Sequence, residues 1–204
     1  MADRFGNNFS AGVDFSVKKK NWIFTADADY IFGNQIKDDS FLNSLKSSSG
    51  YFTGVDGHPA QILLYERGYS LTVVAGKLFP LGKHNVNSGL LFQAGGGFIQ
   101  HKIRIEDADG VFPQLDGDYK KGYDHLTNGF CLQQSLGFFH LDKMKLKNFR
   151  LDFEFIEGFT VGRRNWNFET MSADTQPRLD VLMGFRLTWM LSFYSQNTAQ
   201  VYFY

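Results

Sequence analysis

The stretch Leu179–Tyr194 reads LDVLMGFRLTWMLSFY, and its apolar and polar residues alternate over sixteen positions. The stretch Phe149–Thr160, FRLDFEFIEGFT, shows the same alternation. Side chains of a β-strand point to opposite faces in turn, so each stretch predicts a strand with one apolar and one polar face. Sixteen residues exceed the usual length of a globular strand but suit a tilted strand that crosses a membrane, for which roughly 9–11 residues are enough. The pattern therefore predicts a transmembrane β-barrel.

Seven stretches share this period-two pattern, and the connections between them are alternately short and long. The predicted strands cover residues 8–18, 22–33, 66–79, 89–103, 128–140, 148–160 and 178–194. Outer-membrane barrels have short periplasmic turns and longer extracellular loops. We therefore expect a barrel over residues 1–194, extracellular loops at 34–65, 104–127 and 161–177, and a periplasmic C-terminal tail at 195–204.

An odd number of strands leaves an unpaired edge, although every backbone polar group inside a membrane needs a partner. Single-chain bacterial barrels have an even number of strands. We expect an antiparallel up-and-down barrel of eight strands, whose first strand and signal peptide precede Met1. Alternatively, the tail Thr198–Tyr204 or part of the first long loop closes the sheet.

The composition limits the classes of function. The 21 basic and 21 acidic residues balance, so no global charge recruits nucleic acid. One cysteine, Cys131, excludes an internal disulfide and a multi-cysteine zinc site. No run of apolar residues is long enough for a transmembrane helix. Phenylalanine is abundant, with 22 residues, which fits a barrel that faces lipid.

Glycines on the polar faces argue against a soluble barrel or sandwich, the alternative interpretation. Glycine weakens an exposed strand surface, but it makes room in a crowded lumen. The apolar face also carries more large side chains than the interior of an eight-stranded barrel can hold. The glycines on the predicted lumen faces are Gly12, Gly33, Gly76, Gly95, Gly97, Gly129, Gly137, Gly158 and Gly184.

The predicted lumen also carries charged side chains, which are costly to bury unless they pair. We expect them to form a network of salt bridges that fills a barrel too narrow to conduct; the functional alternative is an ion or proton path. The expected network comprises Asp27, Asp29, Arg150, Asp152, Glu154, Asp180 and Arg186, with Asp14 on the same faces.

One place on the predicted lipid face is less apolar. Gln134 lies near the middle of its strand, and Ala75, Ala94 and Gly96 fall on neighbouring strands. Small residues let a partner segment approach closely in a membrane. These four residues are a candidate partner patch, although a polar residue tolerated at a shallow depth is the simpler explanation of Gln134.

Several motifs resemble a group of small OmpA-like outer-membrane β-barrel proteins of the Bacteroidota type. In such relatives a strand precedes the first motif, and no settled activity belongs to the group. The motifs are Ala2-Asp3-Arg4-Phe5-Gly6-Asn7, Leu64-Tyr65-Glu66-Arg67-Gly68-Tyr69, Gln100-His101-Lys102-Ile103-Arg104-Ile105, Gly117-Asp118-Tyr119-Lys120-Lys121-Gly122-Tyr123-Asp124, and Gly184 with Trp189 and Phe193-Tyr194.

The second long loop holds the only candidates for chemistry at a barrel rim. Asp124 and His125 are adjacent and would point to opposite faces of an extended segment, and no serine nucleophile has a recognisable setting. His101 and His125 flank this loop, but a metal site would need another ligand. A calcium site would draw on Asp107, Asp109, Asp116 and Asp118, whose spacing is not that of an EF-hand.

We expect no catalytic residues, no metal and no cofactor. The expected function is a structural, interaction or surface-binding role for a small outer-membrane barrel whose polar lumen is plugged. Its alternatives are a rim-active enzyme, a narrow channel and an accessory subunit of a larger outer-membrane machine. The expected partners are outer-membrane lipids, the barrel-assembly machinery and a protein of an outer-membrane complex. The expected recognition surface is aromatic: Tyr51, Phe52, Phe112, Tyr119, Tyr123, Trp166 and Phe168.

Overall fold

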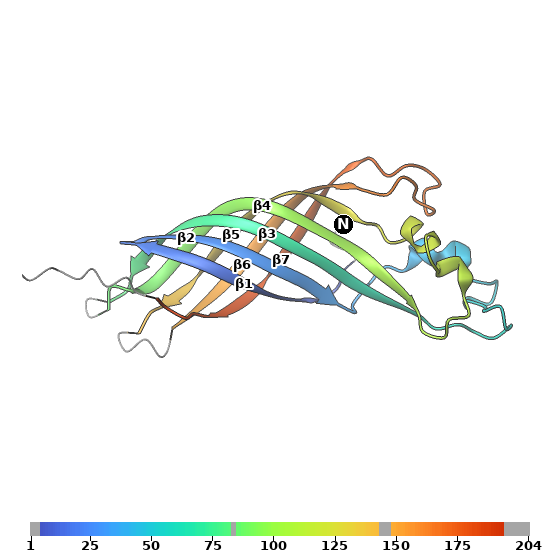
Figure 1. The fold of residues 1–204 in the computed structure, drawn as a ribbon, viewed down its shortest axis with the longest axis horizontal. Helices are drawn as coiled ribbons and strands as arrows, with labels where there is room; N and C mark the ends of the chain where they lie inside the picture. The colour runs from blue at the N-terminus through green and yellow to red at the C-terminus, as the bar shows by residue number, and fades with distance from the viewer. Residues whose placement is uncertain (1–4, 83–84, 143–147, 194–204) are drawn as a thin grey trace, which may run out of the picture.

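Seven strands follow one another in a single curled antiparallel sheet, in the order β1 to β7 (Figure 1). The computed structural model describes residues 5–82, 85–142 and 148–193. The strands are β1 (Phe9–Lys19), β2 (Trp22–Gly33), β3 (Ile62–Pro80), β4 (Ser88–Asp107), β5 (Thr127–His140), β6 (Phe149–Gly162) and β7 (Pro177–Trp189). Each strand pairs with its neighbours in sequence, which confirms the predicted all-β, up-and-down fold.

The connections separate the molecule into two unlike ends. Short connections at 20–21, 81–87 and 141–148 form the turn end, and long connections at 34–61, 108–126 and 163–176 form the loop end. Figure 1 shows the long connections gathered beyond the strands. They contain the short 3-10 helices η1 (Ser40–Leu45), η2 (Pro113–Leu115) and η3 (Tyr119–Gly122). No helix in the described residues is long and apolar enough to cross a membrane.

Two strand boundaries differ from the sequence prediction. The β3–β4 ladder continues past the expected strands to the pair Ile62 and Asp107, so the first two long loops are shorter than predicted. Strand β7 ends at Trp189, because its partner β6 begins opposite it at Phe149. The tail at 195–204 and the predicted final strand residue Tyr194 lie outside the described residues.

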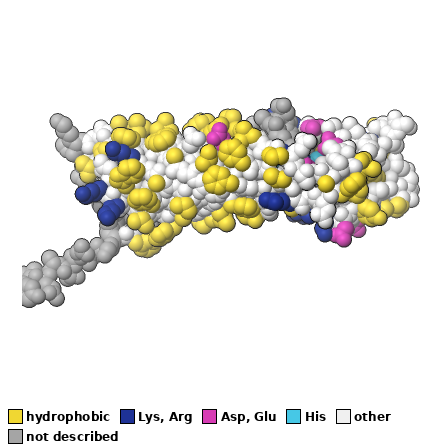
Figure 2. Space-filling model, turned by 90° about the horizontal axis from the view of Figure 1, so that it is seen from above, with side chains coloured by type: hydrophobic (Ala, Val, Ile, Leu, Met, Phe, Trp, Pro, Cys, Tyr) yellow, Lys and Arg dark blue, Asp and Glu magenta, His cyan; other side chains and the backbone are white. Residues whose placement is uncertain are grey.

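The outer face of the sheet is apolar and exposed. In the middle of the sheet, Val73 is 65% exposed, Phe130 55% and Leu136 56%. Hydrophobic side chains are spread over the strand part of the surface in Figure 2. The residues between them along each strand point inward, where polar side chains such as Thr72 and Gln133 are buried. The distribution is the reverse of that in a water-soluble domain.

Glycines on the inner face allow neighbouring strands to approach closely. A Cβ atom on Gly97 would overlap the carbonyl oxygen of Leu71 on β3, and a Cβ atom on Gly95 would overlap that of Val73. These residues were predicted to make room in the lumen. The structure shows that the room is taken by the backbone of the next strand, so the glycines permit the tight curl of the sheet.

The curled sheet has two open edges. Strand β1 pairs only with β2, and β7 pairs only with β6 within the described chain. The first long loop does not close the sheet between them, because Phe41 and Leu42 of η1 pack at the loop end against Ile103. The alternative closure by Thr198–Tyr204 concerns residues outside the described part of the chain.

Candidate functional site

The inner face is organised in layers from the turn end to the loop end. Strand β4 passes through all of them, with Leu91, Gln93, Ile99, His101 and Ile103 pointing inward in succession. The turn-end layer is apolar and consists of Ile23, Leu78, Leu91 and Phe139. The middle apolar layer consists of Ile31, Ile99, Cys131 and Ile156. Polar groups lie on both sides of the middle apolar layer, so apolar and polar layers alternate along the inner face.

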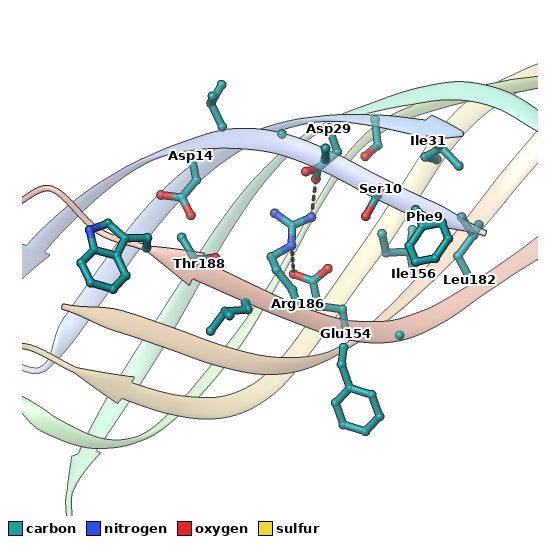
Figure 3. A pocket seen from close by; sticks show the side chains of 18 of the residues that line it. Phe9, Ser10, Asp14, Asp29, Ile31, Glu154, Ile156, Leu182, Arg186 and Thr188 are labelled. Carbon is teal, nitrogen blue, oxygen red and sulfur yellow. Dashed lines mark hydrogen bonds and ion pairs between the residues drawn. The ribbon is translucent and has the colours of Figure 1, made fainter. Parts of the chain in front are cut away.

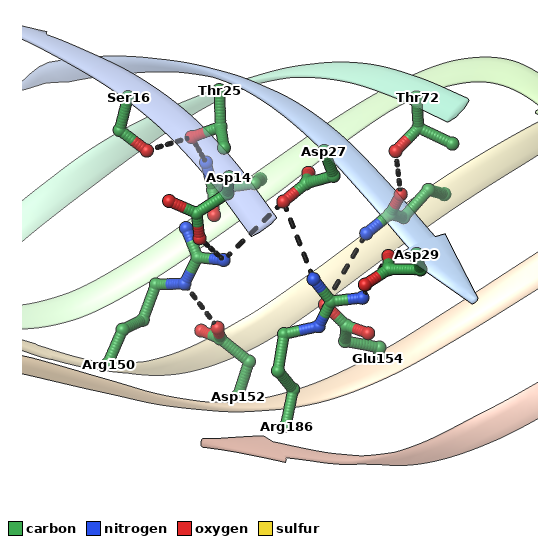
Figure 4. A network of polar contacts seen from close by, with 12 residues as sticks. Asp14, Ser16, Thr25, Asp27, Asp29, Thr72, Arg150, Asp152, Glu154 and Arg186 are labelled. Atoms are coloured by element: carbon green, nitrogen blue, oxygen red, sulfur yellow. Dashed lines mark hydrogen bonds and ion pairs between the residues drawn. The ribbon is translucent and has the colours of Figure 1, made fainter. Parts of the chain in front are cut away.

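A charged layer lies between these two apolar layers, since Asp27 and Asp29 lie between Ile23 and Ile31 on β2. Figure 4 shows its polar contacts. It is defined by Asp14, Asp27, Asp29, Arg150, Asp152, Glu154 and Arg186. The Nε atom of Arg186 lies 2.9 Å from a carboxylate oxygen of Glu154, and its Nη atoms contact Asp27 and Asp29. Arg186 therefore ties β7 to β6 and, across the lumen, to β2.

Arg150 makes the second set of ion pairs in the charged layer. Its Nη2 atom lies 3.2 Å from Asp14 and 3.9 Å from Asp27, and its Nε atom lies 2.6 Å from Asp152. The sequence predicted that Asp27 and Asp29 belong to the same network as the arginines, with Asp14 on the same faces. The structure brings the carboxylates of β1 and β2 to the same guanidinium groups, so the network crosses the lumen.

Uncharged side chains extend the charged layer. Thr72 donates a hydrogen bond of 2.5 Å to Gln133, and the Gln133 amide donates one of 3.4 Å to Glu154. Gln93 donates to Thr25 at 3.1 Å. The alternation of the strands places all four inward, but which of them meet depends on register and curl, so the sequence did not reveal these bonds.

Asp180 lies in a different cluster from the one predicted. Its carboxylate lies 2.9 Å from Nε2 of His101 and accepts a hydrogen bond of 2.5 Å from Thr160. The hydroxyl of Thr127 lies 3.2 Å from the same histidine nitrogen. The middle apolar layer separates this His101 cluster from Arg186, because Leu182 of β7 packs against that layer.

The three long connections pack together into a cap at the loop end. Its buried core combines residues of the first loop, of β4 and of the second loop: Phe41, Leu42, Ala60, Ile103, Ile105, Phe112, Leu115 and Tyr123. Phe52 and Phe168 pack against this core, and the rings of Phe52 and Phe112 meet edge to face at 5.6 Å. These aromatic residues were predicted to form a recognition surface. Only Tyr51, Tyr119 and Trp166 of that set are exposed.

The predicted rim residues Asp124 and His125 are part of the cap structure. Asp124 accepts two hydrogen bonds from Arg164, one of 2.9 Å, which raises the pKa of the guanidinium. His125 lies 3.3 Å from Glu169 and meets the ring of Phe41 edge to face. The two residues have separate partners, and His101 lies in its own cluster below. The structure therefore does not assemble the predicted histidine pair.

The acidic residues at and near the second loop contact backbone amides or nearby lysines. Asp107 accepts a hydrogen bond of 2.6 Å from the amide of Phe112, and Asp109 accepts one of 3.0 Å from Gln61. Asp116 lies 3.9 Å from Lys120. A hydrogen bond with Lys121 lowers the pKa of Asp118. Within the described ranges, no three histidine, cysteine or acidic residues are grouped to hold a metal ion.

The predicted partner patch occupies two neighbouring rows of the outer face. Ala75 of β3 pairs with Ala94 of β4, which pairs with Gln134 of β5. Gly96 lies in the next row, opposite Leu132. Glu157, opposite Leu132 on β6, is a second polar side chain on the same outer face. The structure thus brings the four residues together and adds a carboxylate beside them.

A cavity of about 1720 Å³ separates β1 from β7 (Figure 3). Both open strands line it, and Asp14 and Thr188 extend into it from the two sides. The charged layer is exposed to this cavity through Arg186 and Glu154.

Comparisons with protein-family models, curated proteins and solved structures find no match to this chain.

Proposed function

We propose that the chain is a small, non-catalytic β-barrel of the bacterial outer membrane, with a plugged polar lumen and a structural, interaction or surface-binding role. The observation that carries this proposal is the inverted sheet, with apolar residues outside and charged residues inside. A contiguous apolar surface along most of the sheet is unfavourable in water but is what lipid requires.

Aromatic residues at both margins of the apolar band support a membrane location. Trp22 and Trp189 lie at the turn end, where both are half or more exposed. Tyr30 and Tyr69 pair directly with each other near the loop end. Amphipathic rings favour the two interfaces of a bilayer. We propose that the loop end is extracellular and the turn end periplasmic, with outer-membrane lipids around the strands and the barrel-assembly machinery as the partner during insertion.

The interior favours a plugged barrel over a channel. The turn-end layer, the charged layer and the middle apolar layer lie in series, and the cap covers the loop end. Binding would then fall to the exposed part of the cap, where Tyr51, Tyr119 and Trp166 offer aromatic contacts. We assign no catalytic role to Asp124 or His125, because both side chains are held within the cap.

Membership of the OmpA-like group of the Bacteroidota type stays part of this proposal and rests on the motifs of the chain.

The proposal also includes the closure of the barrel. Strands β1 and β7 run in the same direction because five antiparallel strands separate them. One further strand in the opposite direction would pair antiparallel with both and satisfy both edges, which a membrane demands. We therefore propose an eight-stranded closed form.

The membrane location is testable with the three native tryptophans, Trp22, Trp166 and Trp189. We would prepare three single-tryptophan variants with phenylalanine at the other two positions and insert them into vesicles of dibrominated phosphatidylcholine. Bromine quenches only tryptophans in contact with lipid. We expect quenching of Trp22 and Trp189, which lie on the outer face, and none of Trp166, which lies in the cap.

If each of the three variants fluoresced equally in brominated and in ordinary vesicles, the membrane proposal would be rejected. Recovery of the native protein only in the soluble fraction of cells would reject it as well.

A second candidate, an accessory subunit of a larger outer-membrane machine, is favoured by the partner patch. Gln134 and Glu157 are polar groups in the middle of the outer face, beside the small residues Ala75 and Ala94. Mild detergent extraction should then co-purify a membrane partner that Gln134→Leu releases. Leu136→Ala, on the same strand and face, is the matched control.

A further inference from the structure

Three basic residues gather on the outer face of β3 and β4, close to the cap. Arg67 of β3 pairs with Lys102 of β4, and Arg104 lies two residues further along β4 toward the loop end. They alternate with more deeply buried residues of the two strands, so they point outward. Side chains at directly paired positions start roughly 4.5–5.5 Å apart, and those two residues apart on one strand start about 7 Å apart. The three side chains are therefore long enough to reach one ligand together.

The charges of Arg67 and Lys102 are not balanced by the protein. Neither residue forms an ion pair with a carboxylate in the part of the chain that the structure describes. The only acidic residue at an outward position of β3 or β4 is Glu106, and it pairs with Arg104. Two positive charges remain, which match the charge of about −1.5 to −2 on a phosphate monoester at pH 7.

The guanidinium group of Arg67 is held in one orientation by contacts that do not cancel its charge. Its Nη1 atom donates hydrogen bonds of 2.6 Å to the carbonyl oxygen of Glu66 and 3.1 Å to that of Gly33. The guanidinium carbon lies 4.9 Å from the ring centroid of Tyr65. Its Nε and Nη2 atoms donate to no atom of the described residues, and the N–H groups of these two atoms form a planar fork. Such a fork matches two oxygens of a phosphate group.

The outer face of the same strands is apolar further from the cap. Tyr69 follows Arg67 at the next outward position of β3, and the exposed residues Leu71 and Val73 come after it. The rings of Tyr69 and Phe98 lie 6.0 Å apart on the two strands. On the face drawn in Figure 2, the Lys and Arg side chains lie toward the two ends of the hydrophobic band and not in its middle. An apolar surface that ends in cations is complementary to the acyl chains and the anionic headgroup of a lipid.

We propose that Arg67 and Lys102, with Arg104 beside them, bind the phosphate monoester of a lipid in the outer leaflet, whose acyl chains lie along the outer face of β3 and β4. The Nε and Nη2 groups of Arg67 donate to two phosphate oxygens, and Lys102 supplies the second positive charge. This inference rests on the proposed membrane barrel, with its loop end outside, and adds a lipid of stated chemistry at a stated place.

A tryptophan reporter beside the cluster measures which lipid lies there. Tyr69→Trp replaces one exposed aromatic side chain by another, in the full-length natural protein with phenylalanine in place of Trp22, Trp166 and Trp189. The protein is inserted into phosphatidylcholine vesicles that contain a small fraction of brominated lipid. This lipid is either phosphatidic acid, which is a phosphate monoester, or phosphatidylcholine. Phe153→Trp, an exposed outward position on β6, is the matched reporter away from the cluster.

We expect the reporter on β3 to be quenched more strongly by brominated phosphatidic acid than by brominated phosphatidylcholine. The excess should correspond to enrichment of phosphatidic acid on the order of tenfold, as expected for two cations at a membrane surface. The reporter on β6 should not distinguish the two lipids. Equal quenching by both lipids on β3, or the same excess on both strands, would overturn the inference.

The preference must also depend on the named cations. Arg67→Gln combined with Lys102→Gln should abolish the excess quenching, and Lys102→Gln alone should reduce it, because the contacts of Arg67 stay in place. Lys120→Gln combined with Lys121→Gln removes the same net charge from the cap and should leave the excess unchanged. An excess that survives the first pair of substitutions, or that both pairs abolish, would reject the site.

Insertion into the membrane is measured separately for every variant. Vesicles made entirely of brominated phosphatidylcholine quench both reporters in any inserted chain. Quenching in these vesicles without a preference for phosphatidic acid rejects only this inference. Absence of quenching in them rejects the membrane proposal on which it rests.

Discussion

At the scale of single residues, Gly97 shows how the sequence sets the curl of the sheet. Its missing side chain leaves space for the carbonyl group of Leu71 on the neighbouring strand. We expect Gly97→Ala to force β3 and β4 apart and to lower the free energy of unfolding by about 1–3 kcal/mol, the usual cost of overpacking. Urea unfolding in detergent micelles, followed by tryptophan fluorescence, measures the change.

Gly158→Ala is the matched control, because Gly158 also faces inward but has more space. Its Cβ atom would meet Ile99 Cγ2 at 3.0 Å and no backbone atom closer than 3.6 Å. A methyl group of isoleucine can shift, whereas the backbone of a paired strand cannot. Equal destabilisation by the two substitutions would show that close strand approach is not the role of Gly97.

Arg186 is the residue on which most of the charged layer depends. Arg186→Met keeps much of the side-chain volume but leaves Asp27, Asp29 and Glu154 without their shared cation. We expect a loss of about 3–5 kcal/mol in the free energy of unfolding, as for other buried ion pairs that lose one partner. Arg104→Met is the control, because its ion pair with Glu106 is exposed and should contribute less than about 1 kcal/mol. Similar losses in both variants would contradict the network.

The residue pattern predicts faces better than it predicts partners. Period-two alternation placed Asp152, Glu154 and Arg186 on the inner face because side-chain direction follows from the strand backbone. It also grouped Asp180 with them, although Asp180 contacts His101. Partners across a curled sheet depend on register and on the layer between them, and neither is encoded in the alternation of one strand.

At the scale of elements, the cap joins three loops that are far apart in the sequence. Arg164 of the third loop donates hydrogen bonds to Asp124 of the second loop, and Asp124 is buried. We expect Arg164→Ala to leave a buried carboxylate without its partner and to destabilise the cap by about 1–3 kcal/mol. Hydrogen exchange should become faster in residues 108–126 and 163–176 but not in the middle of β4 or β5.

Substitution of the exposed residue Arg163 is the control that distinguishes the loss of this ion pair from the loss of an arginine in general. It precedes Arg164 and donates its hydrogen bond to Asn128 instead. Arg163→Ala should leave exchange in the second loop unchanged. Faster exchange of that loop in both variants, or in neither, would remove Asp124–Arg164 as the link between the loops.

The loops were the part of the fold that the sequence predicted least well. Their approximate positions followed from the breaks in alternation, but β3 and β4 remain paired as far as Ile62 and Asp107, inside the predicted loops. Phe112 and Tyr123 were predicted to be surface residues and are buried. Loop residues have no periodic backbone, so nothing in the local sequence distinguishes an aromatic residue that packs from one that is exposed.

At the scale of the whole molecule, the apolar and charged layers lie in series along the lumen, beneath the cap. Apolar side chains from different strands meet in the turn-end layer and the middle apolar layer, as do Ile23 with Leu78 and Ile99 with Ile156. An ion that crossed the lumen would lose its hydration at each apolar layer and meet fixed charges between them. In the proposed closed barrel, this arrangement in series means that opening one layer leaves the others closed.

We therefore expect no single-channel current from the full-length protein in planar bilayers. Arg186→Ala should also give none, although it creates space in the charged layer, because the apolar layers that contain Leu91 and Ile99 remain on either side of it. A general porin reconstituted in the same way shows that the assay detects a pore. Regular current steps from the natural protein would contradict a plugged lumen. Steps only from Arg186→Ala would instead show that the charged layer alone seals the barrel and that the apolar layers admit water.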